Sequence, residues 1–306
     1  MCAISGIDMA LLDLKGKVLG VPCYELLGGA YRKDILLYAN YWFTKGGHNE
    51  ADYAEQARAV KAAGFTGLKF DPFAHTNYFY GEDLASNLTL TPAQQDLAFN
   101  VSKAVREAVG PEVDIMIETH AMLNYRIAVK MAERLATLDI AWYEEPAGPE
   151  SSQTLRAMRE RIPSDVAICV GERHYTRFGI RSLLEKHVCD IIMPDITRCG
   201  GPSEMKRMAT MAEAYQVLLA PHNPNGPLST LASSHVCASV PNFFRQEFMF
   251  NDVPWRDTVI DHPIADMVYD GHLHLSDRPG LGVDLVEEEM EKHPGITSNP
   301  PENFYI

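Results

Sequence analysis

The sequence has 306 residues, of which 46% are hydrophobic and 22% charged, proportions typical of a globular protein with a sizeable core. Its formal net charge of −14 argues against nucleic acid and anionic membranes as partners, because binding to either needs a basic face. The six cysteines form no CxxC pair, the N-terminus lacks the basic start of a signal peptide, and no apolar run is long enough for a membrane span. We therefore expect a cytoplasmic protein with free thiols.

The chain begins with an apolar helical segment within residues 1–30, which ends in the run LLGG. After it, short apolar runs alternate with amphipathic segments of helical period. Eight such runs predict buried parallel strands, at residues 35–40, 66–71, 113–118, 140–145, 166–172, 189–195, 216–222 and 243–247. The clearest predicted helices between them cover residues 51–63, 92–109 and 202–214.

Strands that alternate with helices at this spacing predict a parallel sheet with right-handed crossovers, and eight of them predict a closed α/β barrel. No clear helix follows residue 247, so the expected ring is (β/α)7β. We divide the chain into a linking helix (residues 1–30), a catalytic barrel (residues 31–250) and a C-terminal segment (residues 251–306). The long loop 72–90 interrupts the repeat, and loops of this kind often determine specificity.

Polar residues stand where the predicted strands end. They are Asp71, Glu118, Glu144, Glu172, Asp195, His222 and Glu247. From Glu118 onward they follow one another at intervals of about one strand–helix unit. Because the carboxyl ends of barrel strands converge on one face, these side chains are expected to meet in a single site.

Three of these residues, Glu118, Glu144 and Glu172, end consecutive strands. Three carboxylates share a confined site only when a cation compensates their charge. Oxygen ligands alone favour a hard divalent ion, so the sequence predicts a Mg²⁺ site. The alternative is that each is a solvated acid at the start of a loop.

Two histidines complete the predicted site. Asp195 and His222 end neighbouring strands, and a carboxylate beside an imidazole is the usual arrangement of a general base. His120 lies two residues after Glu118, on the same side of the strand end, and is interpreted as a general acid. For both histidines the alternative is an ordinary loop residue.

These groups suit one reaction, the removal of a proton next to a carboxylate followed by loss of a β-hydroxyl group. A divalent ion stabilises the enolate, a base takes the proton and an acid protonates the leaving hydroxyl. Glu247 is interpreted as a hydrogen-bond donor to the enolate, provided that neighbouring acids keep it protonated. Its alternative is a salt bridge to Arg245 or another neighbour.

At this point the sequence resembles a known family, the mandelate racemase subgroup of the enolase superfamily, and within it the D-galactonate dehydratase-like acid-sugar dehydratases. The resemblance covers about residues 3–285. The motifs that carry it are AISGIDMALLDLKGKVLGVPCYELLGG (3–29), YEEP (143–146), GERHYTR (171–177), MPDITRCGG (193–201) and AYQVLLAPHNPNGP (214–227).

The resemblance implies a Mg²⁺-dependent lyase that dehydrates an aldonate-type sugar acid to a 2-keto-3-deoxy acid. It implies that Glu118, Glu144 and Glu172 bind Mg²⁺ and that the Asp195–His222 dyad abstracts the C2 proton. His120 would protonate the departing C3 hydroxyl, and Glu247 matches the acid next to the substrate carboxylate. Relatives are commonly homo-oligomers. The family's N-terminal α+β capping domain is expected before residue 1, so this sequence lacks most of it.

Several positions depart from the family pattern. The first metal position is Glu118, where many relatives have Asp. The second strand ends Lys69-Phe70-Asp71, whereas racemases of this subgroup carry two lysines there. Lys69 is expected to contact substrate or a ligand carboxylate, and Asp71 to bind substrate hydroxyls or Lys69. Asn223 is a further candidate for substrate binding. The rival hypotheses are an epimerase, racemase or cycloisomerase on the same metal platform, or an inactive truncated barrel.

Overall fold

The structure is a computed structural model, and it describes residues 1–44, 49–73, 90–250 and 252–294. The predicted loop 72–90 therefore lies almost entirely outside the described residues. The strands are β1 (Asp34–Asn40), β2 (Gly67–Phe70), β3 (Asp114–Glu118), β4 (Trp142–Glu144), β5 (Ile168–Val170), β6 (Ile191–Ile192), β7 (Leu218–Leu219), β8 (Gln246–Met249), β9 (Val268–Tyr269) and β10 (His272–His274).

The helices lie between and beyond these strands. They are α1 (Cys2–Leu19), α2 (Cys23–Leu26), α3 (Glu50–Ala62), α5 (Pro92–Val109), α6 (Tyr125–Ala136), α7 (Ser152–Arg159), α8 (Thr176–Glu185), α9 (Pro202–Glu213), α10 (Pro227–Ala238) and α11 (Glu287–Lys292), with 3₁₀ turns η1 (Trp42–Thr44) and η3 (Ile264–Met267).

Local sequence signals explain where the barrel helices start and end. At the start of α5, Thr91 accepts a hydrogen bond from Gln94 N while the Gln94 side chain accepts one from Thr91 N, which is a capping box. Helix α3 is followed by Gly64, whose φ of +92° lies in the left-handed region that favours glycine. Helix α9 opens with Pro202 in its first turn, where a missing N–H costs nothing.

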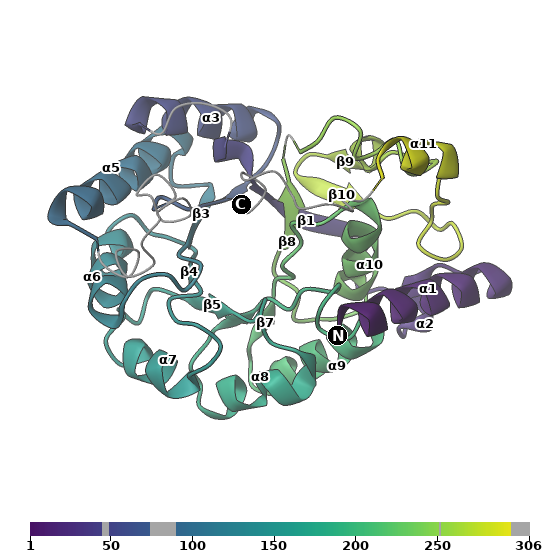
Figure 1. Ribbon diagram of the computed structural model, residues 1–306, viewed down its shortest axis with the longest axis horizontal. Helices are drawn as coiled ribbons and strands as arrows, with labels where there is room; N and C mark the ends of the chain where they lie inside the picture. Colours follow the sequence, from purple (N-terminus) through teal and green to yellow (C-terminus); the bar gives the residue numbers. More distant parts are fainter. Residues whose placement is uncertain (45–48, 74–89, 251, 295–306) are drawn as a thin grey trace.

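Strands β1 to β7 each pair in parallel with the next, and β8 pairs in parallel with β1. A bridge between Leu219 and Phe243 joins the remaining edges, so the ring closes. Figure 1 looks down this ring, with the helices α3 and α5 to α10 around its outside. The (β/α)7β barrel predicted from the sequence is confirmed. The eighth strand, however, runs over Gln246–Met249 instead of residues 243–247.

The inside of the barrel holds a plug of apolar side chains below the predicted site. Its members are Tyr38, Met116, Trp142, Cys169, Ile191, Met193 and Ala220, all 3% exposed or less. A larger core fills the space between the strands and the surrounding helices. Packed side chains inside the ring are the normal state of such barrels. The polar residues at the mouth therefore lie directly above this plug of packed apolar side chains.

The C-terminal segment packs back onto the outside of the barrel. Strands β9 and β10 form an antiparallel hairpin, and β10 pairs antiparallel with the first half of β1. Helix α1 lies next to α9 and α2. None of the helices described is long and apolar enough to cross a membrane.

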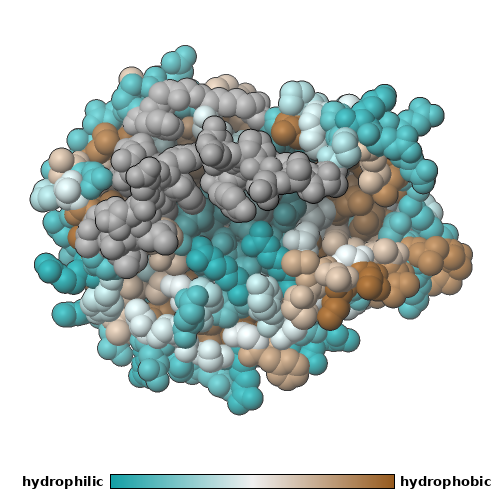
Figure 2. All heavy atoms as spheres, in the orientation of Figure 1, coloured by the Kyte–Doolittle hydropathy of each residue, from teal (hydrophilic) through white to brown (hydrophobic). Residues whose placement is uncertain are grey.

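Helix α1 turns its polar side toward the barrel. Ser5 is buried and accepts a hydrogen bond from Gly200 N at 3.0 Å. Asp8 accepts one from Ser203 N at 2.8 Å and so caps the first turn of α9. The opposite side presents an aliphatic stripe with exposures between 57% and 75%, and Figure 2 shows the hydrophobic residues gathered there. The stripe consists of Ile4, Ile7, Leu11, Leu14 and Val18.

Candidate active site

Three buried glutamates meet at the mouth of the barrel. Glu118 and Glu144 end β3 and β4 in register with each other, and Glu172 follows β5 by two residues. Each offers a carboxylate oxygen, and these atoms all lie within 4.8 Å of one another. The cluster that the sequence predicted is therefore assembled, from three strands that are distant in sequence.

The charges of this cluster are only partly compensated by the protein. Lys69 Nζ lies 2.5 Å from Glu144 Oε1 and 3.4 Å from Glu118 Oε2. Burial and the neighbouring charge of Glu118 raise the pKa of Glu144 well above its usual range, because two adjacent buried carboxylates resist ionising together. Glu172 Oε2 is buried and has no hydrogen-bond partner among the described residues. These features suit a divalent cation with oxygen ligands.

The indole of Trp142 fixes the orientation of one glutamate. Its Nε1 donates a hydrogen bond of 2.7 Å to Glu144 Oε2, from the apolar plug upward. The other oxygen of Glu144 faces Lys69. This arrangement leaves Glu144 little freedom to rotate, which favours a preformed ligand geometry. The sequence offered a signal for this contact, since Trp142 precedes Glu144 by two residues on the same strand and so shares its side.

His222 and Asp195 form the predicted dyad. His222 Nδ1 lies 2.9 Å from Asp195 Oδ2, and His222 Nε2 lies 3.2 Å from Glu172 Oε2. Burial alone would raise the pKa of Asp195, but the hydrogen bonds from His222 and Thr197 outweigh it and lower the pKa to about 2. The carboxylate therefore stays ionised and orients the imidazole, with Nε2 toward the glutamate cluster.

His120 forms a second histidine–aspartate pair at the other end of the cluster. Its Nδ1 lies 2.9 Å from Asp71 Oδ2, and its Nε2 lies 4.0 Å from Glu118 Oε2. Burial lowers the pKa of His120, but the charges of Glu118 and Asp71 dominate and raise it to about 9. The prediction that Asp71 hydrogen-bonds Lys69 is wrong, because its oxygens face His120 Nδ1 and Phe73 N.

The backbone around His120 is unusual. His120 and the next residue, Ala121, have φ of +48° and +57°, and Glu145 on the adjoining strand end has φ of +43°. Such left-handed conformations are uncommon outside glycine and collect at functional sites. They are held here by a hydrogen bond from Ala121 N to Glu145 O and by one from Arg173 Nη2 to His120 O. The rim of the site is thus tied together across three strands.

Glu247 differs from its prediction in two ways. It lies inside β8, as its second residue, instead of ending the strand. It is also ion-paired with Lys69 at 2.9 Å and accepts hydrogen bonds from Asn40 Nδ2 at 2.6 Å and Asn223 N at 2.5 Å. Burial raises the pKa of Glu247, but the charge of Lys69 outweighs it and the pKa falls. This arrangement favours an ionised carboxylate, and the role of Glu247 as a hydrogen-bond donor to the enolate stays a prediction.

Other partners of the site also differ from their sequence interpretations. Arg245, offered as a partner of Glu247, binds Asp114 at 2.6 Å instead. Asn223 is fully buried, and its amide bonds to Thr230 Oγ1 and to Ser229 Oγ, both at 2.8 Å. Substrate binding by Asn223 stays a prediction, but this geometry favours a role in holding the loop after β7.

Comparisons with known proteins agree with this architecture. The family model described as Enolase C-terminal domain-like matches residues 52–289, and the model of the mandelate racemase / muconate lactonizing enzyme N-terminal domain matches residues 1–28. The chain belongs to the enolase superfamily. Its family membership and barrel fold were both predicted from the sequence and are confirmed.

Two curated relatives are dehydratases. The chain is 33% identical to a D-xylonate dehydratase of Haloferax volcanii, over 95% of this chain and 69% of the relative. It is 34% identical to a D-gluconate dehydratase of Thermoproteus tenax, over 98% of this chain but only 57% of the relative's length. The prediction of a hydro-lyase agrees with these names and is confirmed at the level of enzyme class.

A solved structure confirms the fold independently of these names. It is that of a mandelate racemase/muconate lactonizing enzyme-like protein from Rubrobacter xylanophilus, with a TM-score of 0.87 and 35% identity. The match covers 96% of this chain and 77% of the other.

Proposed function

We propose that this protein catalyses the Mg²⁺-dependent dehydration of an aldonate-type sugar acid to a 2-keto-3-deoxy acid. One observation carries the proposal, namely three buried carboxylates within 4.8 Å of one another, flanked at each end by a histidine–aspartate pair. The names of the relatives, which act on D-xylonate and D-gluconate, support the substrate class.

Glu118, Glu144 and Glu172 are the proposed ligands of Mg²⁺. The fit rests on their oxygen donors and on the buried Glu172 Oε2, which lacks a hydrogen-bond partner within the described part of the chain. When bound, the ion supplies positive charge that stabilises the enolate formed next to the substrate carboxylate. Lys69 adds a second positive charge from below, held between Glu144 and Glu247.

His222 is the proposed base. Because Asp195 holds Nδ1, Nε2 is the ring nitrogen that accepts the proton from C2 of the substrate, and the electron pair of the C2–H bond forms the enolate. His120 is the proposed acid. Asp71 holds its Nδ1, so that Nε2–H is the group that protonates the C3 hydroxyl. The C3–O bond then breaks, water leaves, and the resulting enol tautomerises to the 2-keto-3-deoxy acid.

The test is turnover of a sugar-acid library with Mg²⁺, in which mass spectra report loss of water. The same mixtures in D₂O report exchange of the C2 proton by NMR. We expect His222→Asn to lose both exchange and dehydration. We expect His120→Asn to lose dehydration and to retain exchange, since it leaves the base intact. His187→Asn is the matched control, because His187 is exposed and lies between α8 and β6, away from the site.

Each other outcome has a definite meaning. Products of unchanged mass would replace dehydration by epimerisation or cycloisomerisation on the same platform. Exchange that persists in His222→Asn would remove His222 from the role of base. Absence of both Mg²⁺ binding and turnover for all substrates would favour an inactive barrel and overturn the proposal.

A further inference from the structure

The carboxylate of Asp195 is held on both of its oxygens. Oδ1 accepts hydrogen bonds from Thr197 N at 2.7 Å and Thr197 Oγ1 at 2.6 Å. Oδ2 accepts from His222 Nδ1 at 2.9 Å and from Asn225 Nδ2 at 3.1 Å. The Thr197 contacts belong to a local turn. The Asn225 contact instead comes from the loop after β7, the same loop that carries His222.

Asn225 is itself held in place from the C-terminal segment. Arg256 is buried, and its Nη2 lies 3.4 Å from Asn225 O and 2.9 Å from Thr230 Oγ1. Arg256 Nη1 also donates to Met249 O, at the end of β8. One guanidinium group therefore ties the loop after β7 to the start of α10 and to β8. The backbone carbonyl of Asn225 thus has a contact of its own, separate from the hydrogen bond of its side chain.

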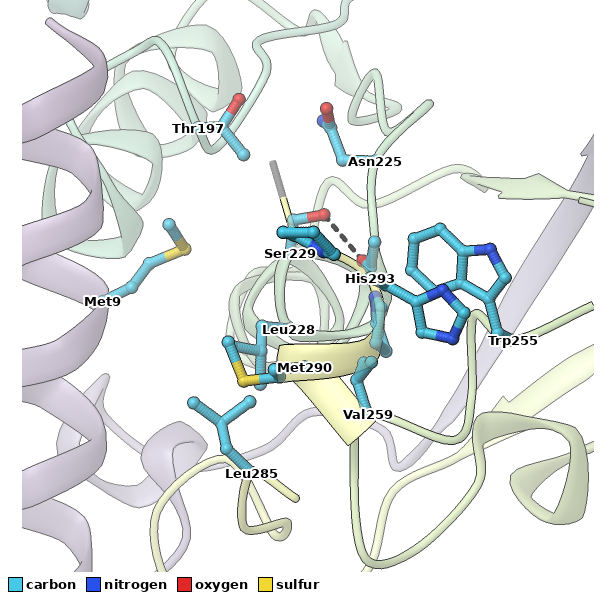
Figure 3. A pocket seen from close by; sticks show the side chains of 13 residues that line it. Met9, Thr197, Asn225, Leu228, Ser229, Trp255, Val259, Leu285, Met290 and His293 are labelled. Carbon is cyan, nitrogen blue, oxygen red and sulfur yellow. Dashed lines mark hydrogen bonds between the residues drawn. The ribbon is translucent and has the colours of Figure 1, made fainter. Parts of the chain in front are cut away.

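The side chain of Asn225 lies between the dyad and a pocket of about 480 Å³. Figure 3 shows Asn225 and Thr197 at one end of this pocket, with Met9 and Trp255 on its other walls. The pocket is lined mainly by apolar side chains, so a leucine at position 225 finds room and apolar neighbours there. A substitution that removes only the amide group is therefore structurally feasible.

We propose that Asn225 is a positioning residue for the Asp195–His222 dyad. By donating to Oδ2 it fixes the plane of the carboxylate, so that Nδ1–H of His222 has one well-defined acceptor. His222 Nε2 then keeps its direction toward the glutamate cluster, where it lies 3.2 Å from Glu172 Oε2. This inference rests on the proposed role of the dyad as base. Misplacement of a reacting group by about 1 Å costs on the order of 100-fold in rate.

The experiment compares Asn225→Leu and Asn225→Asp with the wild type. For both variants we expect the rate constant of C2-proton exchange to fall about 10- to 100-fold, with KM for the sugar acid unchanged within about 2-fold. Asn225→Asp keeps the shape but puts a second carboxylate against Oδ2, so its loss is expected to be at least as large. Leu228→Ala is the matched control, since Leu228 lines the same pocket and its side chain has no polar group to bond Asp195.

A spectroscopic readout tests the same point without turnover. In the metal-free protein labelled with ¹⁵N-histidine, the ring nitrogen shifts of His222 report which nitrogen carries the proton. At a pH where the imidazole is neutral, we expect the Nδ1–H form in the wild type and in Leu228→Ala. In Asn225→Leu we expect shifts averaged between the two tautomers. His222→Asn assigns the resonance by removing it.

Unchanged His222 shifts together with an unchanged exchange rate in both Asn225 variants would overturn the proposal. A rise in KM at constant rate would also overturn it, because it would make Asn225 a substrate contact. If the wild type exchanges no proton with any sugar acid, the proposed function fails, whereas the ¹⁵N shifts still decide whether Asn225 positions His222.

Discussion

The mouth of the barrel and the outer side of α1 both depart from the usual rule that charged residues are exposed and aliphatic residues buried. The mouth buries charged side chains, whereas α1 exposes aliphatic ones. At the mouth, charged side chains such as Glu144, Lys69 and Asp195 are 2% exposed or less. On α1, aliphatic side chains such as Leu11 and Val18 are 60% and 75% exposed. Figure 2 shows both features on one face, a hydrophilic hollow at the centre and a hydrophobic helix at its side.

The difference lies in what holds each region in place. The buried charges satisfy one another through short contacts, and their excess of carboxylates is a property suited to binding a cation. The inner side of α1 is attached to the barrel through polar contacts, such as those of Ser5 and Asp8, and through the partly buried Met9 and Leu12. The buried carboxylates at the mouth thus indicate a site for catalysis. Helix α1 shows that an apolar stripe in a sequence need not pack against the core of the barrel.

The largest effect is expected from Glu172→Gln, which breaks the carboxylate cluster. We expect Mg²⁺ affinity to fall by more than about 100-fold and dehydration to be lost, because one anionic ligand becomes a neutral amide. In the metal-free protein Glu172 lies 3.2 Å from both Arg173 Nε and His222 Nε2, so the loss of these ion pairs should lower its stability slightly. Calorimetric titration with Mg²⁺ and urea unfolding measure the two quantities.

The matched control for this variant is Glu185→Gln on the same barrel. Glu185 is paired with Arg181 on the exposed surface of α8, far from any cluster of acids. It should leave Mg²⁺ binding and turnover unchanged. Normal Mg²⁺ affinity in Glu172→Gln would contradict the assignment of the cluster as a metal site.

The next largest effect concerns His235, a neutral imidazole buried where α10, α2 and the C-terminal segment meet. Its Nδ1 accepts a hydrogen bond from Tyr24 N at 3.2 Å, and its Nε2 lies 3.3 Å from Leu281 O. Burial lowers the pKa of His235 to about 4. The unfolded chain, with a pKa near 6.5, therefore binds the proton first, and stability is lost as the pH falls from about 6.5 toward 4.

This loss amounts to about 3 kcal/mol when complete, at about 1.4 kcal/mol for each pH unit. His235→Gln cannot titrate and keeps a donor and an acceptor. We therefore expect the free energy of unfolding of the variant to fall less steeply than that of the wild type between pH 6.5 and 5. Urea unfolding at several pH values gives both slopes. Equal slopes would mean that His235 is protonated in the folded protein or does not report on folding.

Most of the site followed from the sequence because barrel topology fixes where strand ends meet. Glu118, Glu144 and Glu172 needed only the correct strands, since Glu118 and Glu144 end β3 and β4 in register and Glu172 follows β5 at the same face of the barrel. The same holds for Asp195 and His222, which follow the ends of the short strands β6 and β7 by three residues each. No side-chain geometry had to be known.

The partners of individual side chains did not follow. Asp71 turned out to bind His120 and Glu247 to bind Lys69, choices that depend on rotamers and on distances across the ring. The eighth strand was displaced because the aromatic run at residues 243 and 244 looks like a strand but precedes it. The inward side of α1 was also unpredictable, since a stripe of aliphatic residues carries no information about which neighbour it meets.

The smallest effects on stability are expected from substituting alanine for two glycines of α1, one in a crowded position and one in an open position. A Cβ at Gly16 would lie 2.8 Å from both Gly280 Cα and Val21 O, which are backbone atoms that cannot easily move. A Cβ at Gly6 would meet nothing within 4 Å. Gly16→Ala should therefore destabilise the protein by about 1–3 kcal/mol through overpacking. Gly6→Ala should stabilise it by about 0.5–1 kcal/mol through helix propensity.

Urea unfolding of the two variants at one pH gives both values, with Gly6→Ala as the internal control for the change in helix propensity. Opposite signs would mean that α1 is packed tightly on the segment around Gly280 while the helix is open around Gly6. If both alanines stabilised the chain equally, the close approach of α1 to Gly280 would be wrong. Helix α1 would then be loosely packed around both glycines, and its attachment to the barrel could not be compared with the tightly packed mouth.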